Sequence, residues 1–482
     1  MTRRFPTPRR RQPGLKRAFM FLALGLTLSV WLISDRTAPT SHAVIEAPNP
    51  PPLPSIDAGI QRVASRAHYI YARPATDSAI IGRIGADEPF DVFDTAAGTG
   101  CGEPGWFKTE GGGFVCAEAS RSTAEHSLRL PRLVRFVHPD PTEWTQYLST
   151  MQYDTDPSDR LDAMVPFIYA KRWRKWRGPN YASAAAYAAG DPPIRRLGAG
   201  RKYHFVDADH TERGTVLVRE NGAVVPADDV HIYPLSKFEG WDLSEAPIPA
   251  GHLPAWAIDY EGTAVYASPS LKAPVGKRLS YHSTVIVEDE PVDAAGHWWM
   301  MPNGLGPGVP GYVNDQTGIR HWVPRPAVEG VRPGELWIDI DLGQQVLALR
   351  RGEDVTFATL VSTGAPGTST PRGVYAITKK AIWTDMASRP DSDDPYYVEK
   401  VPWVMHFKKR YALHGTFWHW GFGHRASHGC INLSVRDART VFDLVSPRAY
   451  GGWTTAMATA GTPGTVLRIR RDLSPVPDRR GG

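Results

Sequence analysis

Apolar and polar residues alternate most regularly in the C-terminal third of the chain. Residues 337–342 alternate, Gly343 permits a turn and residues 345–349 return, which together predict a β-hairpin. Ser434, followed three residues later by Asp437, forms a capping box and predicts a helix that ends near Val445. Further strands are expected at 356–363, 373–378, 404–406, 411–414 and 465–470. Residues 335–472 are therefore predicted to form a mainly β domain with one main helix, followed by a disordered tail, 473–482.

Two other stretches of short alternating strands, separated by Gly and Pro turns, resemble each other. Residues 59–122 contain Tyr71-Ala72-Arg73-Pro74, then Trp106, then Gly113-Phe114-Val115. Residues 251–323 contain Tyr266-Ala267-Ser268-Pro269, then Trp299, then Gly311-Tyr312-Val313. The pattern predicts a small β-barrel in each copy, and it resembles that of bacterial SH3-like domains. Such modules either bind cell-wall peptides or act as spacers.

The connecting regions are less regular. Residues 35–58 are rich in proline and predict an extended linker, and residues 324–334 predict a second one. Residues 123–250 predict an α+β region of unknown role, with a helix at 159–174 and strands near 204–207, 215–219 and 230–233. The basic and aromatic run 171–177 is interpreted as a solvated helix end, with contact to glycan or another anionic polymer as the alternative.

The N-terminus carries a signal for membrane targeting. Seven Arg and Lys residues within the first 17 positions precede an uncharged apolar run, residues 18–33. Residues 1–34 therefore predict a cytoplasmic basic segment with either a cleaved signal or an uncleaved membrane anchor. Both alternatives place the following residues across the membrane. We expect the protein in the cell envelope, periplasmic or extracytoplasmic, and anchored to the inner membrane by residues 18–33 if the signal is retained.

Charge and cysteine content narrow the functional classes. The net charge of +5 favours anionic surroundings such as an envelope polymer. No RNA-binding signature, recognition-helix pattern or zinc-finger spacing is present, so nucleic acid is not an expected partner. Of the three cysteines, Cys101 and Cys116 lie close in sequence across an expected hairpin and form the natural disulfide pair in an oxidising compartment. This pairing leaves Cys430 as a free thiol and as a candidate nucleophile.

Candidate chemistry concentrates in residues 413–433. A thiol attacks as the thiolate, so Cys430 needs a nearby base or positive field. His428, two residues upstream, lies on the same face of a strand or turn, and His414 can face the thiol across a hairpin. The backbone N–H groups of Gly429 and Cys430, just before an expected helix, suit the stabilisation of an oxyanion.

A metal site is the alternative use of this segment. His414, His419, His424, His428 and Cys430 are all side chains that bind zinc. Their spacing matches no compact zinc motif, and no second cluster accompanies them. We therefore expect neither a metal nor another cofactor, and we interpret His419 and His424 as parts of a loop that covers the site.

The run Ser427-His428-Gly429-Cys430-Ile431-Asn432, with His414-Gly415-Thr416 upstream, resembles the signature of the L,D-transpeptidases. The runs 362–364 and 370–375 belong to the same resemblance, which covers residues 335–472. It implies a β-sandwich-like catalytic domain, here preceded by the SH3-like barrels. One departure is Asn432, where many members of the family carry arginine; this departure leaves substrate preference open.

The resemblance also implies roles for the site residues. Cys430 is the nucleophile, and His414 is the general base that forms an ion pair with it and is oriented by the Gly415 carbonyl. His428 and Gly429 shape the oxyanion and substrate site. The residues expected to contact substrate are Ser427, Asn432, Thr416, Trp403 and Tyr397.

The implied substrate is a peptidoglycan tetrapeptide stem. Cys430 attacks the carbonyl between the diamino acid at position 3 and D-Ala at position 4, and an amine of a neighbouring stem resolves the thioester into a 3–3 cross-link. The polar segment 383–402 is expected to interrupt the sheet, and its aromatic residues make it either a lid over the donor peptide or a solvated loop.

Other acceptors give other activities. Water would make the protein an L,D-carboxypeptidase, a lysine of another protein would make it an anchoring enzyme, and a cross-link hydrolase is a third possibility on the same fold. A non-catalytic cell-wall-binding protein is the alternative from another class, disfavoured because Cys430 and His414 are both present. Since the reactive groups are local, a fragment starting near Val331 is expected to keep thiol reactivity.

Overall fold

The structure, a computed structural model, describes residues 60–122 apart from 87 and 104, residues 133–134, 153–154 and 167–172, residues 178–388 apart from 199, and residues 395–471. The predictions for residues 1–34, including the signal or anchor at 18–33, for the linker 35–58 and for the tail 473–482 lie outside these ranges. Within them, no helix has the length and apolar character needed to cross a membrane. All the described residues belong to one compact unit, Ala58–Gly482.

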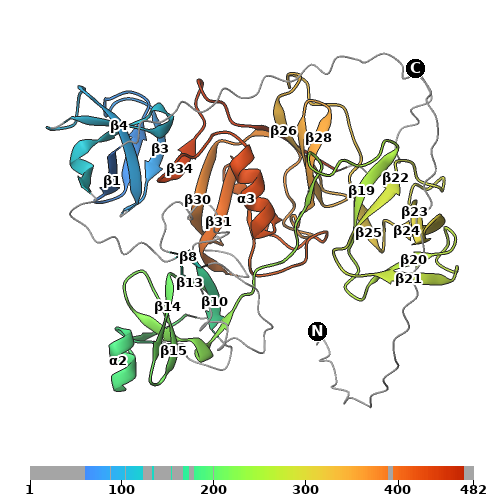
Figure 1. Ribbon diagram of the computed structural model, residues 1–482, viewed down its shortest axis with the longest axis horizontal. Helices are drawn as coiled ribbons and strands as arrows, with labels where there is room; N and C mark the ends of the chain where they lie inside the picture. Colours follow the sequence, from blue (N-terminus) through green and yellow to red (C-terminus); the bar gives the residue numbers. More distant parts are fainter. Residues whose placement is uncertain are drawn as a thin grey trace, which may run out of the picture. The chain divides into compact units, whose positions relative to one another are not determined.

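The C-terminal residues form two sheets and a helix (Figure 1). The first sheet has the strand order β18 (Trp241–Asp242), β28 (Asp354–Leu360), β27 (Val346–Arg351), β26 (Leu336–Asp341), β35 (Val466–Arg470) and β29 (Gly373–Ala376). The second layer contains β34 (Trp453–Met457), β30 (Lys379–Ala387), β31 (Tyr397–Lys408), β32 (Tyr411–Gly415) and β33 (Ile431–Leu433). Helix α3 (Val435–Leu444) follows β33 directly, after Ser434.

Apolar residues from both layers and from α3 share one buried core, which includes Ile338, Leu349, Val404, Leu433 and Val441. The predicted hairpin is β26–β27, and the predicted cap is present because the Asp437 N–H donates to the Ser434 hydroxyl at 3.0 Å. The mainly β fold class is confirmed, and α3 is the longest helix among the described residues.

The segment 383–402 does not interrupt the sheet as predicted. β30 and β31 pair antiparallel from Lys379 opposite His406 to Ala387 opposite Tyr397, so most of the segment is a long extension of the sheet. The pairing shifts register between Thr384 and Met386. Two residues of β31, Lys400 and Trp403, have positive φ angles of 48° and 56°. These irregularities break the two-residue alternation that a sequence pattern assumes.

The two predicted modules have corresponding strand pairings. In the first module β1 pairs with β4 and β7, and β2 pairs with β3 and β6; in the second, β19 pairs with β22 and β25, and β20 pairs with β21 and β24. The ring centroids of Tyr71 and Trp106 lie 5.4 Å apart, as do those of Tyr266 and Trp298. Trp298, and not the predicted Trp299, is therefore the counterpart of Trp106.

The strands of the first module are β1 (Ile60–Ala64), β2 (His68–Tyr71), β3 (Ile80–Ile84), β4 (Pro89–Ala96), β5 (Trp106–Thr109), β6 (Phe114–Cys116) and β7 (Ser120–Ser122), with short helices η1 (Glu110–Gly112) and η2 (Ala117–Ala119). Those of the second are β19 (His252–Ala257), β20 (Thr263–Tyr266), β21 (Val275–Leu279), β22 (Thr284–Glu288), β23 (Trp298–Gly306), β24 (Val309–Asn314) and β25 (Ile319–His321).

The helix predicted at 159–174 is wrong over its described part. Residues Ile168–Arg172 form strand β10, which pairs with β13 (Arg201–Phe205) and β17 (Val230–Ile232). The basic residues of the run 171–177 therefore begin in a strand and not in a helix end. The other described elements between the two modules are β8 (Leu133–Val134), β9 (Tyr153–Asp154), β11 (Pro179–Asn180), α2 (Ala184–Ala189), β12 (Arg195–Arg196), β14 (Asp207–Thr211), β15 (Gly214–Val218), β16 (Val224–Pro226) and η5 (Ala227–Asp229).

The segments upstream of residue 335 are built into the C-terminal fold. Strand β3 of the first module pairs with β34, β13 pairs in parallel with β31, and β18 pairs with β28. Trp256 and Trp322 of the second module share a buried cluster with Leu360 and Phe422. The predicted linker 324–334 also lies against this fold, because the Arg468 guanidinium donates to the Pro326 carbonyl at 2.7 Å.

These contacts change the expectation for a fragment that starts near Val331. Residues 331–471 alone should melt at a lower temperature than residues 58–471, because Phe422 and Leu360 lose buried partners and β34 loses its pairing with β3. Thermal unfolding of the two fragments, followed by circular dichroism, measures the difference. Equal melting temperatures would show that the upstream segments contribute no stability to the C-terminal fold.

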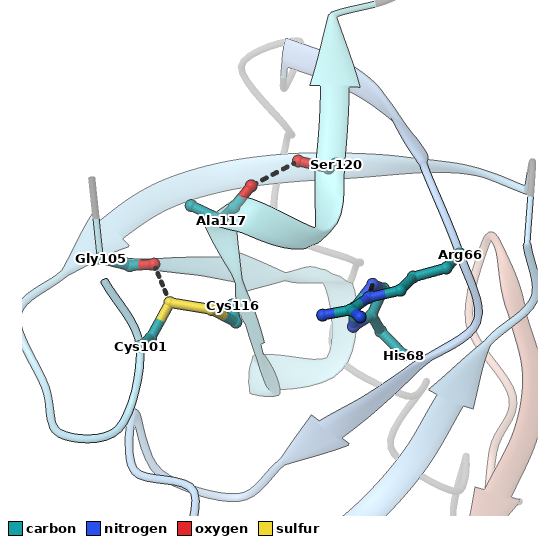
Figure 2. The surroundings of a disulfide bond; sticks show 7 residues. All are labelled: Arg66, His68, Cys101, Gly105, Cys116, Ala117 and Ser120. Carbon is teal, nitrogen blue, oxygen red and sulfur yellow. Dashed lines mark hydrogen bonds between the residues drawn. A yellow bond between two sulfur atoms is a disulfide. The ribbon is translucent and has the colours of Figure 1, made fainter. Parts of the chain in front are cut away.

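The first module contains a disulfide between Cys101, in the loop before β5, and Cys116, the last residue of β6 (Figure 2). Among the described residues Cys430 is the free cysteine. The structure therefore has the pairing that the cysteine positions predict.

Replacing Cys101 and Cys116 together by serine should lower the free energy of unfolding of the first module by about 3 kcal/mol, because the disulfide closes a short loop in the unfolded chain. Urea unfolding without reductant measures this change. Alkylation of Cys430 serves as the control and should keep its wild-type rate. A peptide map of the active, unreduced protein that links Cys430 to either of the other cysteines would contradict the pairing.

Candidate active site

The candidate site lies where β32 and β33 run side by side. These strands pair in parallel, with His414 opposite Asn432. Asn432 comes two residues after Cys430, so the predicted nucleophile lies in the turn that leads directly into β33. The predicted base lies on β32, the parallel neighbour of that strand, and not across a hairpin from the thiol. Cys430 is also followed by β33, so α3 does not begin directly after it.

His414 is held with one ring nitrogen free to act as a base. Its side chain is 2% exposed, and Nδ1 lies 3.1 Å from the Gly415 carbonyl oxygen. A carbonyl oxygen only accepts hydrogen bonds, so Nδ1 carries the proton and Nε2 carries the lone pair. Burial lowers the pKa of His414 to about 4, and the ring is therefore neutral at physiological pH. The Thr416 hydroxyl, 3.4 Å from Nδ1, supports the same orientation.

Cys430 is half-buried, and its sulfur lies 3.8 Å from the Arg410 carbonyl oxygen. Burial raises the pKa of the Cys430 thiol above its ordinary value, while the nearby Arg410 charge acts in the opposite direction. A backbone hydrogen bond from Ala412 also lowers the pKa of this thiol, so the turn offers local stabilisation to a thiolate.

The turn before Cys430 is fixed by its own hydrogen bonds. The Gly429 N–H donates to the Ser427 hydroxyl at 3.0 Å, and this hydroxyl donates to the Cys430 carbonyl at 2.5 Å. The hydroxyls of Thr370 and Thr368 donate to the carbonyls of Gly429 and Ser427, both at 2.9 Å. Gly429 has a φ of 111°, and a Cβ there would lie 2.6 Å from the Tyr411 ring. Glycine is therefore required at this position.

Several residues with predicted roles are used within this turn or beside it. The Gly429 N–H already donates within the turn, whereas the Cys430 N–H has no hydrogen-bond partner among the described residues and is the better candidate for an oxyanion donor. The Ser427 hydroxyl likewise holds the turn. Thr416 is fully buried beside His414.

The aromatic residues of the predicted lid, segment 383–402 and the following Trp403, point in other directions than predicted. Trp403 is 6% exposed and packs against Phe442 and Arg439 on α3. The Tyr397 hydroxyl donates to Asp385 at 2.5 Å, and its ring lies under Arg201. The neighbouring Tyr396 is the residue that reaches the site, with its ring centroid 5.0 Å from that of the exposed His428.

His419 is the residue whose contribution the sequence did not reveal. Its Nε2 is hydrogen-bonded to the Asn432 side-chain amide at 2.8 Å, and its Nδ1 accepts the Gly421 N–H at 3.2 Å. Asn432 is 2% exposed and lies opposite His414. His419 therefore holds the Asn432 side chain beside the strand that carries His414. Among the described residues no group of three or more His, Cys, Asp or Glu side chains is arranged to hold a metal ion.

Comparison with known proteins identifies the class of this site. Residues 335–467 match the family model of the YkuD L,D-transpeptidase catalytic domain. This part of the chain is therefore an L,D-transpeptidase catalytic domain, with the site at its parallel strand pair β32–β33.

Solved structures of L,D-transpeptidases are similar to part of this chain. A catalytic domain from E. faecium, solved by NMR, is 22% identical; the match covers 28% of this chain and 98% of that one, with a TM-score of 0.23. An L,D-transpeptidase from Mycobacterium smegmatis is 18% identical over 39% of this chain and 90% of that one, with a TM-score of 0.24. A search of curated proteins finds no match.

Proposed function

We propose that this protein is a cysteine-dependent L,D-transpeptidase that uses peptidoglycan tetrapeptide stems as acyl donors and forms 3–3 cross-links. The observation that supports the proposal is that Cys430 directly precedes β33, the strand that pairs in parallel with the strand of His414, and that both residues lie inside the matched domain. The neutral, correctly protonated His414 ring is the base that such a reaction needs.

In the acylation step His414 Nε2 takes the thiol proton while Cys430 Sγ attacks the carbonyl carbon that joins the position 3 diamino acid to D-Ala. Transfer of this proton produces the thiolate, which is the form of cysteine that attacks. The Cys430 N–H stabilises the developing oxyanion. The C–N bond then breaks, the D-Ala amine receives the proton from His414, and a thioester remains on Cys430.

In the second step an amine of a neighbouring stem attacks the thioester carbonyl. His414 accepts the proton of that amine, the C–S bond breaks, and the thiol is restored. Tyr396, which contacts His428 beside the nucleophile, is the lid residue that we propose to lie over the bound peptide. The location remains the cell envelope, with residues 18–33 as the signal or anchor.

The product distribution separates this function from its alternatives. The soluble protein from residue 58 is incubated with purified disaccharide tetrapeptides, and the products are sequenced by mass spectrometry. Dimers joined between two position 3 residues, with release of D-Ala, are expected. Tripeptides alone would indicate a carboxypeptidase, cleavage of added 3–3 dimers would indicate a hydrolase, and no change with any of these substrates would favour a wall-binding protein.

A covalent inhibitor gives an independent test. An L,D-transpeptidase domain from E. faecium has been solved acylated by ertapenem. We expect ertapenem to acylate this protein at Cys430, with a single adduct by intact-mass measurement and peptide mapping.

A further inference from the structure

The loop 419–424, between the catalytic strands β32 and β33, is held by the second module. The Tyr281 hydroxyl donates to the Trp420 carbonyl at 3.1 Å and lies 3.4 Å from the Phe422 carbonyl oxygen. His282 Nε2 lies 3.2 Å from the same Phe422 oxygen, and because a carbonyl only accepts, this nitrogen carries the proton. Two adjacent side chains of the β21–β22 turn thus bind the carbonyl oxygens of Trp420 and Phe422 in the loop.

Further contacts extend this attachment to Phe422 itself and to the two residues after it. The Arg320 guanidinium donates to the Gly423 carbonyl at 3.1 Å, and His424 Nε2 donates to the Ile258 carbonyl at 2.8 Å. Phe422 itself is fully buried against Trp256 and other residues of the shared cluster. The second module therefore fixes both the backbone and the central side chain of the loop.

The first residue of the same loop, His419, contacts Asn432 on β33. His419 is hydrogen-bonded to the Asn432 amide, and Asn432 lies opposite His414 and two residues after Cys430. A displacement of residues 420–423 would move His419, because the Gly421 N–H donates to its Nδ1. A short chain of hydrogen bonds thus connects the Tyr281–His282 turn to β33, the strand that directly follows Cys430.

His282 adopts a backbone conformation that favours glycine. Its φ angle is 65°, in the left-handed region, where a residue with a Cβ is strained. Its ring lies between Tyr281, with a centroid separation of 3.8 Å, and Phe238, at 4.4 Å. A strained position that places an imidazole on a carbonyl of the catalytic loop is evidence for a role of that side chain.

We propose that the second module is a working part of the active site, in which Tyr281 and His282 are positioning residues that set the 419–424 loop and, through His419, the Asn432 amide beside Cys430. The kinetic side of this inference rests on the proposed transpeptidase function. It goes beyond that function because it gives residues 251–323 a role in positioning the active-site loop 419–424. Neither a wall-binding module nor a spacer would have this role.

His282→Gly separates positioning from turn stability. Glycine suits the φ of 65°, so the turn should keep its backbone conformation, while the hydrogen bond to Phe422 and the ring packing on Tyr281 and Phe238 are lost. We expect faster hydrogen–deuterium exchange in residues 419–424 and 431–433 and a fall in kcat of about ten-fold, with little change in KM. Tyr281→Phe, which keeps the ring but removes the hydroxyl, should change both readouts in the same direction.

Tyr266→Phe is the matched control, because it removes a hydroxyl from the same module where the ring packs on Trp298 and not on the loop. Exchange and kcat in this variant should equal those of the wild type. If His282→Gly leaves exchange in both segments at the control level, the proposal is overturned, whatever its activity. If exchange rises but the wild-type protein cross-links no muropeptide, the positioning contact stands and the proposed function fails.

Discussion

Cys430→Ala is expected to abolish cross-linking and D-Ala release, because no thioester can form without the sulfur. The effect should exceed that of any other single substitution, since loss of the nucleophile removes the covalent route itself. The fold should persist, because the thiol is half-buried and its weak contact with the Arg410 carbonyl is 3.8 Å long. The measurements are muropeptide turnover and melting temperature, on the wild type and the variant side by side.

Two controls make this result specific. The Cys101→Ser, Cys116→Ser double variant should retain turnover, since its sulfurs form the disulfide of the first module and lie outside the matched domain. Ertapenem should add to that double variant and to the wild type, but not to Cys430→Ala. Turnover that survives in Cys430→Ala would require another nucleophile and would refute the assignment.

His414→Ala should lower kcat/KM by about 10²- to 10⁴-fold, the range typical of a lost general base. The direction follows from the site. Burial raises the pKa of the Cys430 thiol, so without the imidazole the thiolate forms only at alkaline pH. Alkylation of Cys430 by iodoacetamide, measured from pH 5 to pH 10, should therefore become slow at neutral pH and recover as the pH rises.

The wild-type pH profile tests the same residue without a substitution. The pKa of His414 is about 4, so the base is unprotonated above that value and protonated below it. Activity should thus fall on the acid side near pH 4, and not near the ordinary histidine value of about 6.5. His428→Ala is the control: His428 is exposed, and its loss should impair turnover while changing the alkylation profile less. Reversed profiles for the two variants would exchange their roles.

Local sequence patterns were sufficient to predict much of the C-terminal fold and to choose the candidate reactive groups. Alternation and the Gly343 turn place β26–β27 correctly, and the Ser434 cap marks the start of α3. Cys430 and His414 could be selected from residue chemistry and from the family signature. The parallel pairing of β32 with β33 could not be predicted from the sequence. Strand β33 has only three residues, which is too short for an alternation pattern that indicates its partner.

The lid segment shows why side-chain direction was misjudged. A register shift in β30 and positive φ angles at Lys400 and Trp403 remove the strict alternation on which a prediction of facing depends. Trp403 therefore enters the core and Tyr396, not Tyr397, reaches the site. Attachment of the second module was equally hidden, because its hydrogen bonds join residues about 140 positions apart in sequence.

The mass of the acyl-enzyme shows directly whether Cys430 forms the thioester with the donor peptide. The soluble protein is mixed with a disaccharide tetrapeptide in the absence of an acceptor amine, quenched with acid and analysed as intact protein and as peptides. We expect one added acyl group, with the mass of the donor minus D-Ala, on the peptide that contains Cys430. The Cys430→Ala variant should carry no such group. Cross-linking without any such adduct, or an adduct on a different residue, would contradict this assignment.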